Sequence, residues 1–380
     1  MTKNIKDLIV IFKGNITQSP PQLNFLQSAN DLGIRLRLIC ADVAADTLQY
    51  LQGSCPRLEV INLDIRAKGK DRFSKLAYWY KFRKRVWDYL KRQAGSYDAL
   101  WIGSADTALC LGKKLQQEVY YLNVLELYDT LPWHRKLLRN YARNALAVVV
   151  PEYNRACIFR TWWGLRKTPF ILPNAPYNIE VVQKEDMAQR YQEIISNLEQ
   201  QSRGRKIILY QGLITPRRRL DEIAAAVGRL SGEDYLFVVL GPQYENYVEQ
   251  LKAVNPATIW IPAIPAPYHL IITQMAYIGI VVYNYTNLNN IFCAPNKIWE
   301  YSYVSKPMIC NDIPGLRFTV EYNKAGVCIN TEDIESVVGA IRKIDGQYTD
   351  YTRKANEFFS LSRYKDTVSE ILTSKTVAVE

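Results

Sequence analysis

Residues 295–315 read Pro295-Asn296-Lys297-Ile298-Trp299-Glu300-Tyr301-Ser302-Tyr303-Val304-Ser305-Lys306-Pro307-Met308-Ile309-Cys310-Asn311-Asp312-Ile313-Pro314-Gly315, which predicts a short helix capped by the Pro-Asn pair, a buried strand and a Pro-Gly turn. Lys297 and Glu300 are three residues apart, so they share one helix face. The helix N-terminus at Asn296 and the Lys297 ammonium can hold phosphate oxygens. Glu300 can accept hydrogen bonds from sugar hydroxyls. The stretch therefore predicts a nucleotide-sugar site.

Apolar runs around this stretch alternate with helical patterns in two series. The first series predicts buried strands at 8–12, 36–40, 58–63, 99–102, 119–124 and 147–150. The second predicts strands at 206–211, 235–240, 259–261, 278–282, 307–310 and 326–329. Such alternation is typical of doubly wound parallel sheets. Two prolines in 172–176 interrupt regular structure between the series, so we predict an α/β protein with domains at 1–174 and 175–360.

The quoted stretch resembles the donor-binding signature of retaining glycosyltransferases with the GT-B fold, of the family-4 type. Their pattern is Pro-x-Lys-x-x-Glu-Tyr, then a small residue with Lys-Pro, then Asp-x-Pro-Gly, and 295–315 keeps both residues and spacing. The resemblance implies two Rossmann-like domains facing a cleft. The acceptor would bind to 1–174 and the nucleotide sugar to 175–360, and the last helix, about 360–380, would pack back on the first domain.

The segment 210–221 looks like the family's Gly-Arg-Leu-x-x-x-Lys-Gly segment. Gly212 matches its first glycine, and Arg218 stands at the lysine that contacts the donor diphosphate. A guanidinium suits phosphate, so we expect Arg218 to hold the diphosphate, with Arg217 or Arg219 beside it. The alternative is a solvated basic loop.

Three positions depart from the family pattern. Phe292 stands where the family has the first Glu of Glu-x7-Glu, so Asn289 or Asn290 would have to contact the transferred sugar instead. Leu213 and Leu125 replace a family arginine and a family histidine. These departures leave open a non-catalytic binding protein with this fold, and the fold also suits a sugar-nucleotide epimerase or phosphorylase.

Two residues of the first series are further candidates. Gly14 follows the first predicted strand, where a glycine lets a ligand approach backbone amides, although an ordinary turn has the same sequence. Glu126 lies in a segment that resembles the family's His-Glu or His-Asp pair. It can orient an acceptor hydroxyl or contact the donor sugar, or it can cap a helix. His134 is expected to be a surface or packing residue.

The positive charge of the chain lies in its first half. The net charge is +11, and residues 1–176 hold 27 Lys and Arg against 14 Asp and Glu, whereas 177–380 hold 21 against 23. Such asymmetry indicates an anionic partner for the first half.

Basic and aromatic residues are concentrated in 66–92, with 11 Lys and Arg against two Asp. As a helix this segment has two apolar stripes, which are Phe73, Leu76, Tyr80, Trp87 and Leu90, and Trp79, Phe82, Val86 and Tyr89. One stripe can pack on the domain while the other faces a bilayer interface. The predicted membrane or acceptor surface consists of Trp79, Lys81, Arg83, Lys84, Arg85 and Trp87. The alternatives are a solvated face over a core helix and a single-stranded nucleic-acid surface, for which no nucleic-acid motif is present.

Several site classes are disfavoured by composition. The seven cysteines form no C-x-x-C pair, which indicates reduced thiols in a cytoplasmic protein. Only two histidines and no Asp-x-Asp triplet are present, which argues against a metal-held donor. No secretory signal is visible, and the longest apolar run, 271–285, is too short and polar to span a bilayer.

We therefore expect a metal-independent hexosyltransferase that uses a nucleoside-diphosphate sugar and a lipid-linked saccharide or other membrane-associated acceptor, in surface polysaccharide synthesis. The family implies retention of the anomeric configuration. The catalytic candidates are Arg218, Lys297 and Glu126, and the donor-binding candidates are Gly14, Gly212, Asn290, Asn296 and Glu300. No cofactor, metal or nucleic acid is expected. The protein is expected to be cytoplasmic and peripheral on the inner face of the cell membrane, where the lipids are anionic.

Overall fold

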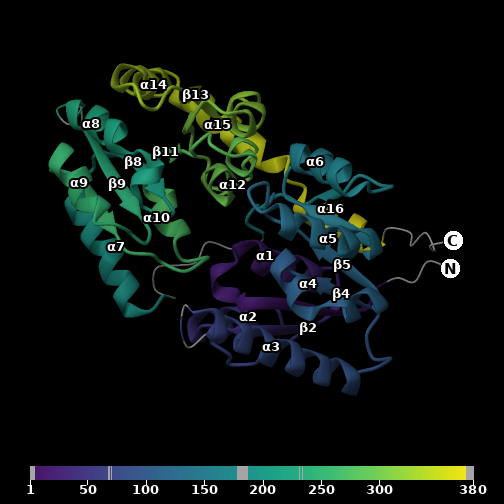
Figure 1. Cartoon of the computed structure of the whole chain (residues 1–380). Coiled ribbons are helices and arrows are strands. Elements are labelled where there is room, and N and C mark those ends of the chain that lie inside the picture. The colour runs from purple at the N-terminus through teal and green to yellow at the C-terminus, as the bar shows by residue number, and fades with distance from the viewer. Residues whose placement is uncertain are drawn as a thin grey trace. The chain divides into compact units, whose positions relative to one another are not determined.

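The computed structural model describes residues 5–66, 69, 71–177, 187–230, 232 and 234–373. The chain divides into two compact units, which Figure 1 shows in ribbon form. Unit 1 is Met1–Asn178 with Arg363–Glu380, and unit 2 is Ile179–Ser362. Each unit is built on one parallel sheet, so the prediction of two doubly wound α/β domains is confirmed.

Unit 1 has a seven-stranded sheet in the order β3-β2-β1-β4-β5-β6-β7, and all its described pairings are parallel. Its strands are β1 (Asp7–Asn15), β2 (Arg35–Asp42), β3 (Leu58–Asn62), β4 (Ala99–Ile102), β5 (Tyr120–Asn123), β6 (Ala147–Val150) and β7 (Phe170–Ile171). Its helices are α1 (Pro20–Asp31), α2 (Ala45–Ser54), α3 (Arg72–Arg92), α4 (Ala105–Leu111), α5 (Pro132–Asn144), α6 (Tyr153–Trp163) and α16 (Tyr364–Thr373). Short 3-10 turns, η1 (Ile16–Gln18) and η2 (Lys113–Gln117), complete it.

The strands of unit 1 form where apolar runs can be buried on both faces. Leu8 to Ile11 of β1 are fully buried between helix layers. β1 continues to Asn15, so Gly14 lies inside the strand rather than after it, and the predicted end at Phe12 was wrong. β7 was not predicted because two residues are too few to give an apolar run.

The helix α16 belongs to unit 1 although it comes last in the chain. It packs against α1, where the Tyr364 hydroxyl donates to the Pro21 carbonyl at 3.4 Å. The Tyr364 ring also lies 5.6 Å from the Tyr177 ring, centroid to centroid. The predicted continuation of this helix over 374–380 lies outside the described residues.

Unit 2 has a six-stranded parallel sheet in the order β10-β9-β8-β11-β12-β13. Its strands are β8 (Lys206–Gln211), β9 (Tyr235–Leu240), β10 (Ile259–Ile261), β11 (Ala276–Val281), β12 (Met308–Asn311) and β13 (Gly326–Ile329). Its helices are α7 (Gln189–Ser202), α8 (Asp221–Arg229), α9 (Tyr247–Val254), α10 (Leu270–Met275), α11 (Leu288–Ile291), α12 (Asn296–Tyr303), α13 (Pro314–Leu316), α14 (Ile334–Gly346) and α15 (Tyr348–Ser360). A 3-10 turn, η4 (Pro216–Arg218), and a π-helical turn, η6 (Arg317–Glu321), lie between them.

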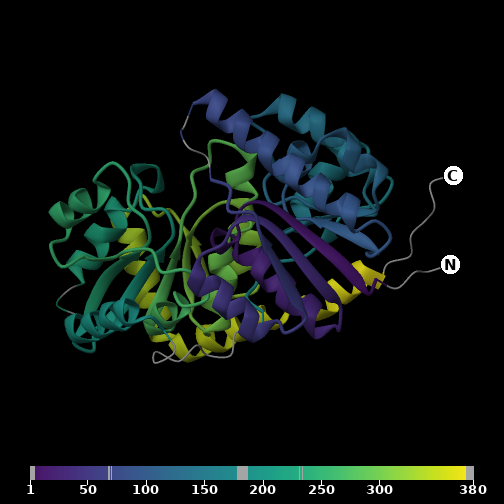
Figure 2. The same ribbon diagram turned by 90° about the horizontal axis from the view of Figure 1, so that it is seen from below.

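Helices cover both faces of the unit 2 sheet, as Figure 2 shows from below. On one face, apolar side chains of α8 and α14 pack on alternate strand residues such as Ile208 and Ile280. On the other face, α7, α12 and α15 pack on residues such as Leu209 and Val281. The described part of the chain contains no helix that is both long and apolar enough to cross a membrane.

Candidate functional site

The strand order of the unit 2 sheet reverses between β8 and β11. Strands β9 and β10 follow on one side of β8, whereas β12 and β13 follow on the other side of β11. In open α/β sheets, ligands bind beyond the carboxyl ends of the strands at such a switch point. The loops that leave β8 and β11, at 212–219 and 282–286, are therefore the first place to look for a site.

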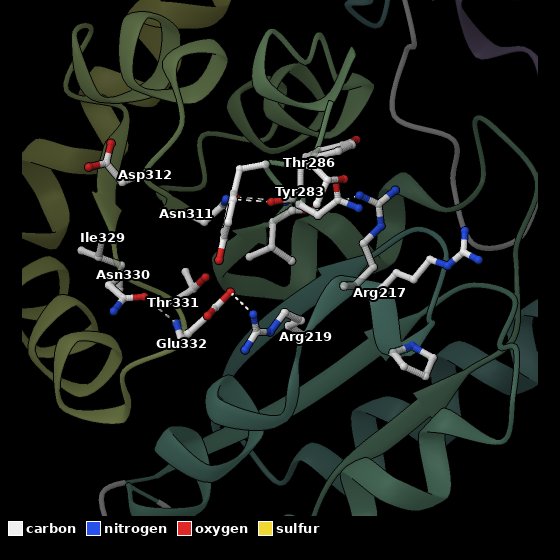
Figure 3. Close-up of a pocket in the computed structure, with 15 residues that line it drawn as sticks. Arg217, Arg219, Tyr283, Thr286, Asn311, Asp312, Ile329, Asn330, Thr331 and Glu332 are labelled. Atoms are coloured by element: carbon white, nitrogen blue, oxygen red, sulfur yellow. Dashed lines mark hydrogen bonds and ion pairs between the residues drawn. The ribbon is translucent and has the colours of Figure 1, made fainter. Parts of the chain in front are cut away.

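A pocket of about 510 Å³ lies beside these loops. It is lined by four segments, 216–219, 282–286, 311–312 and 329–332, which follow β8, β11, β12 and β13. Figure 3 shows Arg219 and Glu332 facing each other on one side of the pocket, where Arg219 Nη1 lies 2.7 Å from Glu332 Oε1. Most of the lining side chains are polar or charged, which suits a ligand with hydroxyl and anionic groups.

Tyr283 is held in place at the wall of this pocket. The Asn311 amide accepts from the Tyr283 N–H at 2.9 Å and donates to the Tyr283 carbonyl at 2.8 Å. Arg218 lies with its guanidinium carbon 4.4 Å from the Tyr283 ring centroid, and Arg218 Nη1 donates to the Val282 carbonyl at 3.3 Å. A guanidinium has five N–H donors, so Arg218 keeps most of its donors for a ligand.

Lys297 brings a second cation to the same ring. Its side chain on α12 is buried, with 8% of the residue exposed. Its Nζ lies 5.5 Å from the Tyr283 ring centroid and 4.4 Å from that of Tyr210. The ammonium is held by these two rings. Among the described residues it forms no ion pair with a carboxylate. Buried charges are ordinarily paired, so this ammonium is prepared to receive an anion.

Gly212 makes room for that ammonium. Its φ is +130°, a backbone conformation that side chains disfavour. A Cβ atom placed on Gly212 would lie 3.0 Å from Lys297 Nζ. The backbone geometry therefore favours glycine here, and a Cβ atom would also displace the ammonium slightly. The predicted residues Gly212, Arg218 and Lys297 come together at the switch point.

Burial and the nearby Arg218 guanidinium lower the pKa of Lys297 to about 7, against the weaker opposite effect of Glu300. Both dominant causes disfavour a second positive charge in this space. A bound anion would reverse the balance and favour the charged ammonium.

Lys297→Met is expected to raise the free energy of unfolding near pH 6 to 7, and this gain should shrink as the pH rises to about 9.5. The pKa of Lys297 is about 7 in the folded state and ordinary, near 10.5, in the unfolded state. Between these pH values the unfolded state of the wild type binds more protons than its folded state. The free energy of unfolding of the wild type therefore rises with pH, by at most about 1.4 kcal/mol per pH unit. Urea unfolding of both proteins across this range measures the difference. A difference that does not change with pH would contradict the lowered pKa.

Glu300 lies one turn further along α12 and is held by protein groups on both oxygens. Gln211 Nε2 donates to Oε2 at 2.5 Å, and His269 Nε2 lies 3.2 Å from Oε1. Thr273 Oγ1 in turn donates to Gln211 Oε1 at 2.9 Å. Burial alone would raise the pKa of Glu300, but the charge and hydrogen bond of His269 and the hydrogen bond of Gln211 outweigh it and lower the pKa.

These contacts revise the role expected for Glu300. Its carboxylate is ionised and buried, and its first partners are Gln211 and His269 rather than open space. A carboxylate has about four lone-pair positions, so two remain for a ligand hydroxyl. Gln211, His269 and Thr273 were not predicted. Gln211 directly precedes Gly212, but nothing in the sequence signals that residues 269 and 273 reach this carboxylate.

Two more predicted donor-binding residues lie on α11 and α12. Asn296 is the first residue of α12, and Pro295, the N-cap, offers no side-chain cap, so the expected Pro-Asn cap was wrong in this detail. The Asn290 side chain on α11 donates to Asn284 Oδ1 at 2.5 Å and thereby supports the pocket-lining loop.

The remaining predicted site residues belong to unit 1. Glu126 follows β5, with 56% of its side chain exposed, and its Oε2 lies 3.9 Å from Arg155 Nη1. Gly14 is packed within β1, where a Cβ atom would lie 2.9 Å from the Phe12 ring. His134 Nε2 lies 3.0 Å from Asp106 Oδ1, in keeping with a packing role.

The predicted surface residues of α3 differ in their contacts. Trp87 donates from Nε1 to the Leu111 carbonyl at 3.0 Å, and the Trp79 ring is half-buried beneath Lys13. Arg83 and Arg85 donate to the Cys110 and Leu63 carbonyls. These four side chains therefore contact other parts of unit 1, although Arg83 and Arg85 are exposed like the predicted Lys81 and Lys84. Lys68 and Lys70, which were counted with them, lie outside the described residues.

Residues 192–355 match the family model described as Glycosyl transferases group 1, which confirms the predicted family for this segment. Among solved structures, Anabaena HepE in complex with UDP-glucose has a TM-score of 0.67 at 11% identity, covering 96% of each chain. Sucrose-phosphate synthase from Thermosynechococcus elongatus has a TM-score of 0.66 at 14% identity, covering 96% of each chain.

WaaG, a glycosyltransferase involved in lipopolysaccharide biosynthesis, has a TM-score of 0.61 at 14% identity, covering 97% of this chain and 100% of WaaG. At such identities the similarity shows the fold alone, and the predicted GT-B fold is confirmed. No curated protein matches the chain.

Proposed function

We propose that this chain, whose residues 192–355 belong to the glycosyl transferases group 1 family, transfers a hexose from a nucleoside-diphosphate sugar to an acceptor hydroxyl. One observation carries the proposal. Two cationic side chains, Lys297 and Arg218, lie over the same Tyr283 ring at the switch point of unit 2. The buried one is not paired with a carboxylate in the described part of the chain.

The reaction breaks the bond between the anomeric carbon and the diphosphate oxygen, and the diphosphate leaves with the electron pair. The acceptor oxygen forms the new bond to the anomeric carbon, and its proton passes to an oxygen of the departing diphosphate. Cations placed where the negative charge develops stabilise the transition state, and we assign this role to Arg218 and Lys297. Because these side chains can neutralise the leaving group, the proposal includes turnover without a metal ion.

The pocket beside Tyr283 supports binding of a hydroxyl-rich donor to unit 2. We assign the contacts to sugar and phosphate oxygens to polar side chains that line the pocket, to Asn290, which donates to the lining Asn284, and to Asn296. HepE was crystallised with UDP-glucose, so a UDP-hexose is the first donor we propose. Glu300, held by Gln211 and His269, would present its remaining lone pairs to a donor hydroxyl.

The acceptor is proposed to bind to unit 1, with Glu126 orienting its hydroxyl. Unit 1 carries the positive excess of the chain, which supports an anionic, membrane-associated acceptor such as a lipid-linked saccharide. The proposed location is accordingly the inner face of the cell membrane, with a role in surface polysaccharide synthesis and retention at the anomeric carbon.

The test is a thermal-shift and turnover screen of the wild type and Lys297→Met with UDP-, GDP- and other nucleotide sugars, in EDTA. We expect one nucleotide to raise the Tm of the wild type by several degrees, since a ligand at 100 times its Kd adds about 2.7 kcal/mol. Lys297→Met should lose most of this response. Slow release of free hexose should accompany binding.

Three outcomes of the screen decide between the candidates. No stabilisation by any nucleotide sugar contradicts the proposal. Stabilisation without turnover supports the non-catalytic binding protein, a reading that Phe292 at the place of a family glutamate favours. Conversion of the donor into its epimer supports the sugar-nucleotide epimerase.

A further inference from the structure

Helix α3 leaves a row of large apolar side chains exposed on unit 1. Phe73 is 83% exposed, and Leu76 and Tyr80 are also exposed. Positions separated by three, four and seven residues lie on one helix face, so these three form a single row. The opposite face of α3 carries the buried residues Phe82 and Val86, which pack on the unit.

Helix α5 presents a second exposed set. Trp133 is 75% exposed, and Leu137, four residues later, and Leu131, at the N-cap, are also exposed. The buried side of the same helix consists of Leu138, Tyr141 and Ala142. Two helices of one unit therefore each present an apolar face that does not pack within the unit.

The two exposed sets flank one short helix. Helix α4 contacts both α3 and α5 and lies between their labels in Figure 1. Lys13 Nζ lies 4.5 Å from the Trp79 ring centroid of α3 and 3.9 Å from Asp106 Oδ2 of α4. His134 of α5 reaches the other oxygen of Asp106. Tyr80 directly follows Trp79 and Trp133 directly precedes His134, so the two sets lie on helices that are joined through this cluster.

Basic side chains surround both sets. The exposed cations of these two helices include Lys75, Lys81, Lys84, Lys136 and Arg139. Lys136 Nζ lies 5.5 Å from the Trp133 ring centroid. Helix α5 contains no acidic residue, and α3 contains only Asp88. An apolar face ringed by Lys and Arg is typical of helices that lie in the interface of an anionic bilayer.

We propose that Phe73, Leu76, Tyr80, Leu131, Trp133 and Leu137 form one surface, here called the α3–α5 face, which enters the headgroup region of an anionic lipid bilayer. Exposed apolar patches of this kind mark interaction sites, and the charge complementarity selects an anionic membrane as the partner. Tyr and Trp suit such an interface because one end of the side chain is apolar and the other polar. The face gives the predicted membrane surface a different composition, since Trp79 and Trp87 are bound within unit 1.

The inference rests on the proposed function only for the location of the acceptor, and its test needs no turnover. Full-length protein is sedimented with vesicles of pure phosphatidylcholine and with vesicles that also contain roughly 30–40% phosphatidylglycerol. The second composition imitates an anionic leaflet. We expect binding to the anionic vesicles that weakens in high salt, and little binding to the neutral ones.

Two variants test the face itself. Phe73→Ser with Leu76→Ser, and Trp133→Ser with Leu137→Ser, should each weaken vesicle binding at least about tenfold, because each removes apolar area that would leave water. Phe318→Ser with Tyr322→Ser is the matched control, since both residues are exposed aromatics of unit 2, whose half of the sequence carries no positive excess. All three variants change exposed residues, and an unchanged Tm confirms that each is folded.

Equal binding by the wild type and the α3–α5 variants overturns the inference. An equal loss of vesicle binding in the control variant, or a wild type that does not bind anionic vesicles, also overturns it. If the substitutions instead abolish self-association, as measured by sedimentation velocity, the face is an interface between copies of the chain and the inference is again overturned. Stabilisation by a nucleotide sugar without vesicle binding would leave the proposed function standing and remove only this inference. Vesicle binding without any donor binding would do the reverse.

Discussion

Replacing Lys297 by methionine is expected to lower kcat/KM for the nucleotide sugar by roughly 10²- to 10³-fold, the usual effect of removing one preorganised group that stabilises transition-state charge. The ammonium is buried over the Tyr210 and Tyr283 rings and lies in the space that Gly212 leaves open. Methionine has a similar length and keeps the space filled, so the change removes the charge and little else. Steady-state kinetics with the donor found in the screen give the result.

Lys306→Met is the matched control for this prediction. Lys306 is another partly buried lysine of unit 2, whose pKa is lowered by burial, and it lies just before β12. Its removal should leave kcat/KM within about threefold of the wild type, a change of under 1 kcal/mol in the activation free energy. A Lys297→Met variant that is folded and turns over donor within threefold of the wild type would show that the diphosphate is held elsewhere.

Glu300→Ala is expected to lower the free energy of unfolding by about 1–3 kcal/mol, the range found when buried hydrogen-bonding groups are left without a partner. The change leaves the buried Gln211 amide and the partly buried His269 ring without the oxygens that they now contact. It also removes the carboxylate that favours the charged form of Lys297. Urea unfolding at pH 7 measures the loss, and donor affinity should fall with it.

Two further variants bracket this effect. Glu300→Gln keeps one acceptor oxygen and the shape of the side chain, so its loss should be clearly smaller than that of the alanine variant. Glu335→Ala on α14 removes an exposed ion pair with Arg229 of α8 and should change stability by at most about 1 kcal/mol. If Glu300→Ala costs no more than Glu335→Ala, the buried network is not what holds α12 against β8.

The fold was largely predictable because its elements are local patterns. The apolar runs of 206–211 and 235–240 coincide with β8 and β9, since strands buried on both faces read as continuous apolar segments. The short helix at Lys297 and Glu300 was signalled by its spacing and by the resemblance it carries. The ends of elements were less predictable, as Gly14 shows, because the β1 strand continues through a polar stretch that has no periodic pattern.

The partners of the site residues were not predictable, because they come from distant parts of the chain. Gln211, for example, lies 89 positions before Glu300 in the sequence, and no spacing rule covers such contacts. The exposed and buried stripes of α3 could not be told apart for another reason. Its two apolar stripes, one containing Phe73 and the other Phe82, are similar in sequence, and only packing decides that Phe82 is buried and Phe73 exposed.

The central claim is that Arg218 and Lys297 together hold the donor diphosphate in unit 2. Calorimetric titration of a UDP-hexose into the wild type, the Arg218→Gln/Lys297→Met double variant and Lys306→Met tests it most directly. We predict one binding site in the wild type and in Lys306→Met, and at least a 100-fold weaker affinity in the double variant, roughly the loss of two charge-assisted contacts. Equal affinity in all three proteins would contradict the claim.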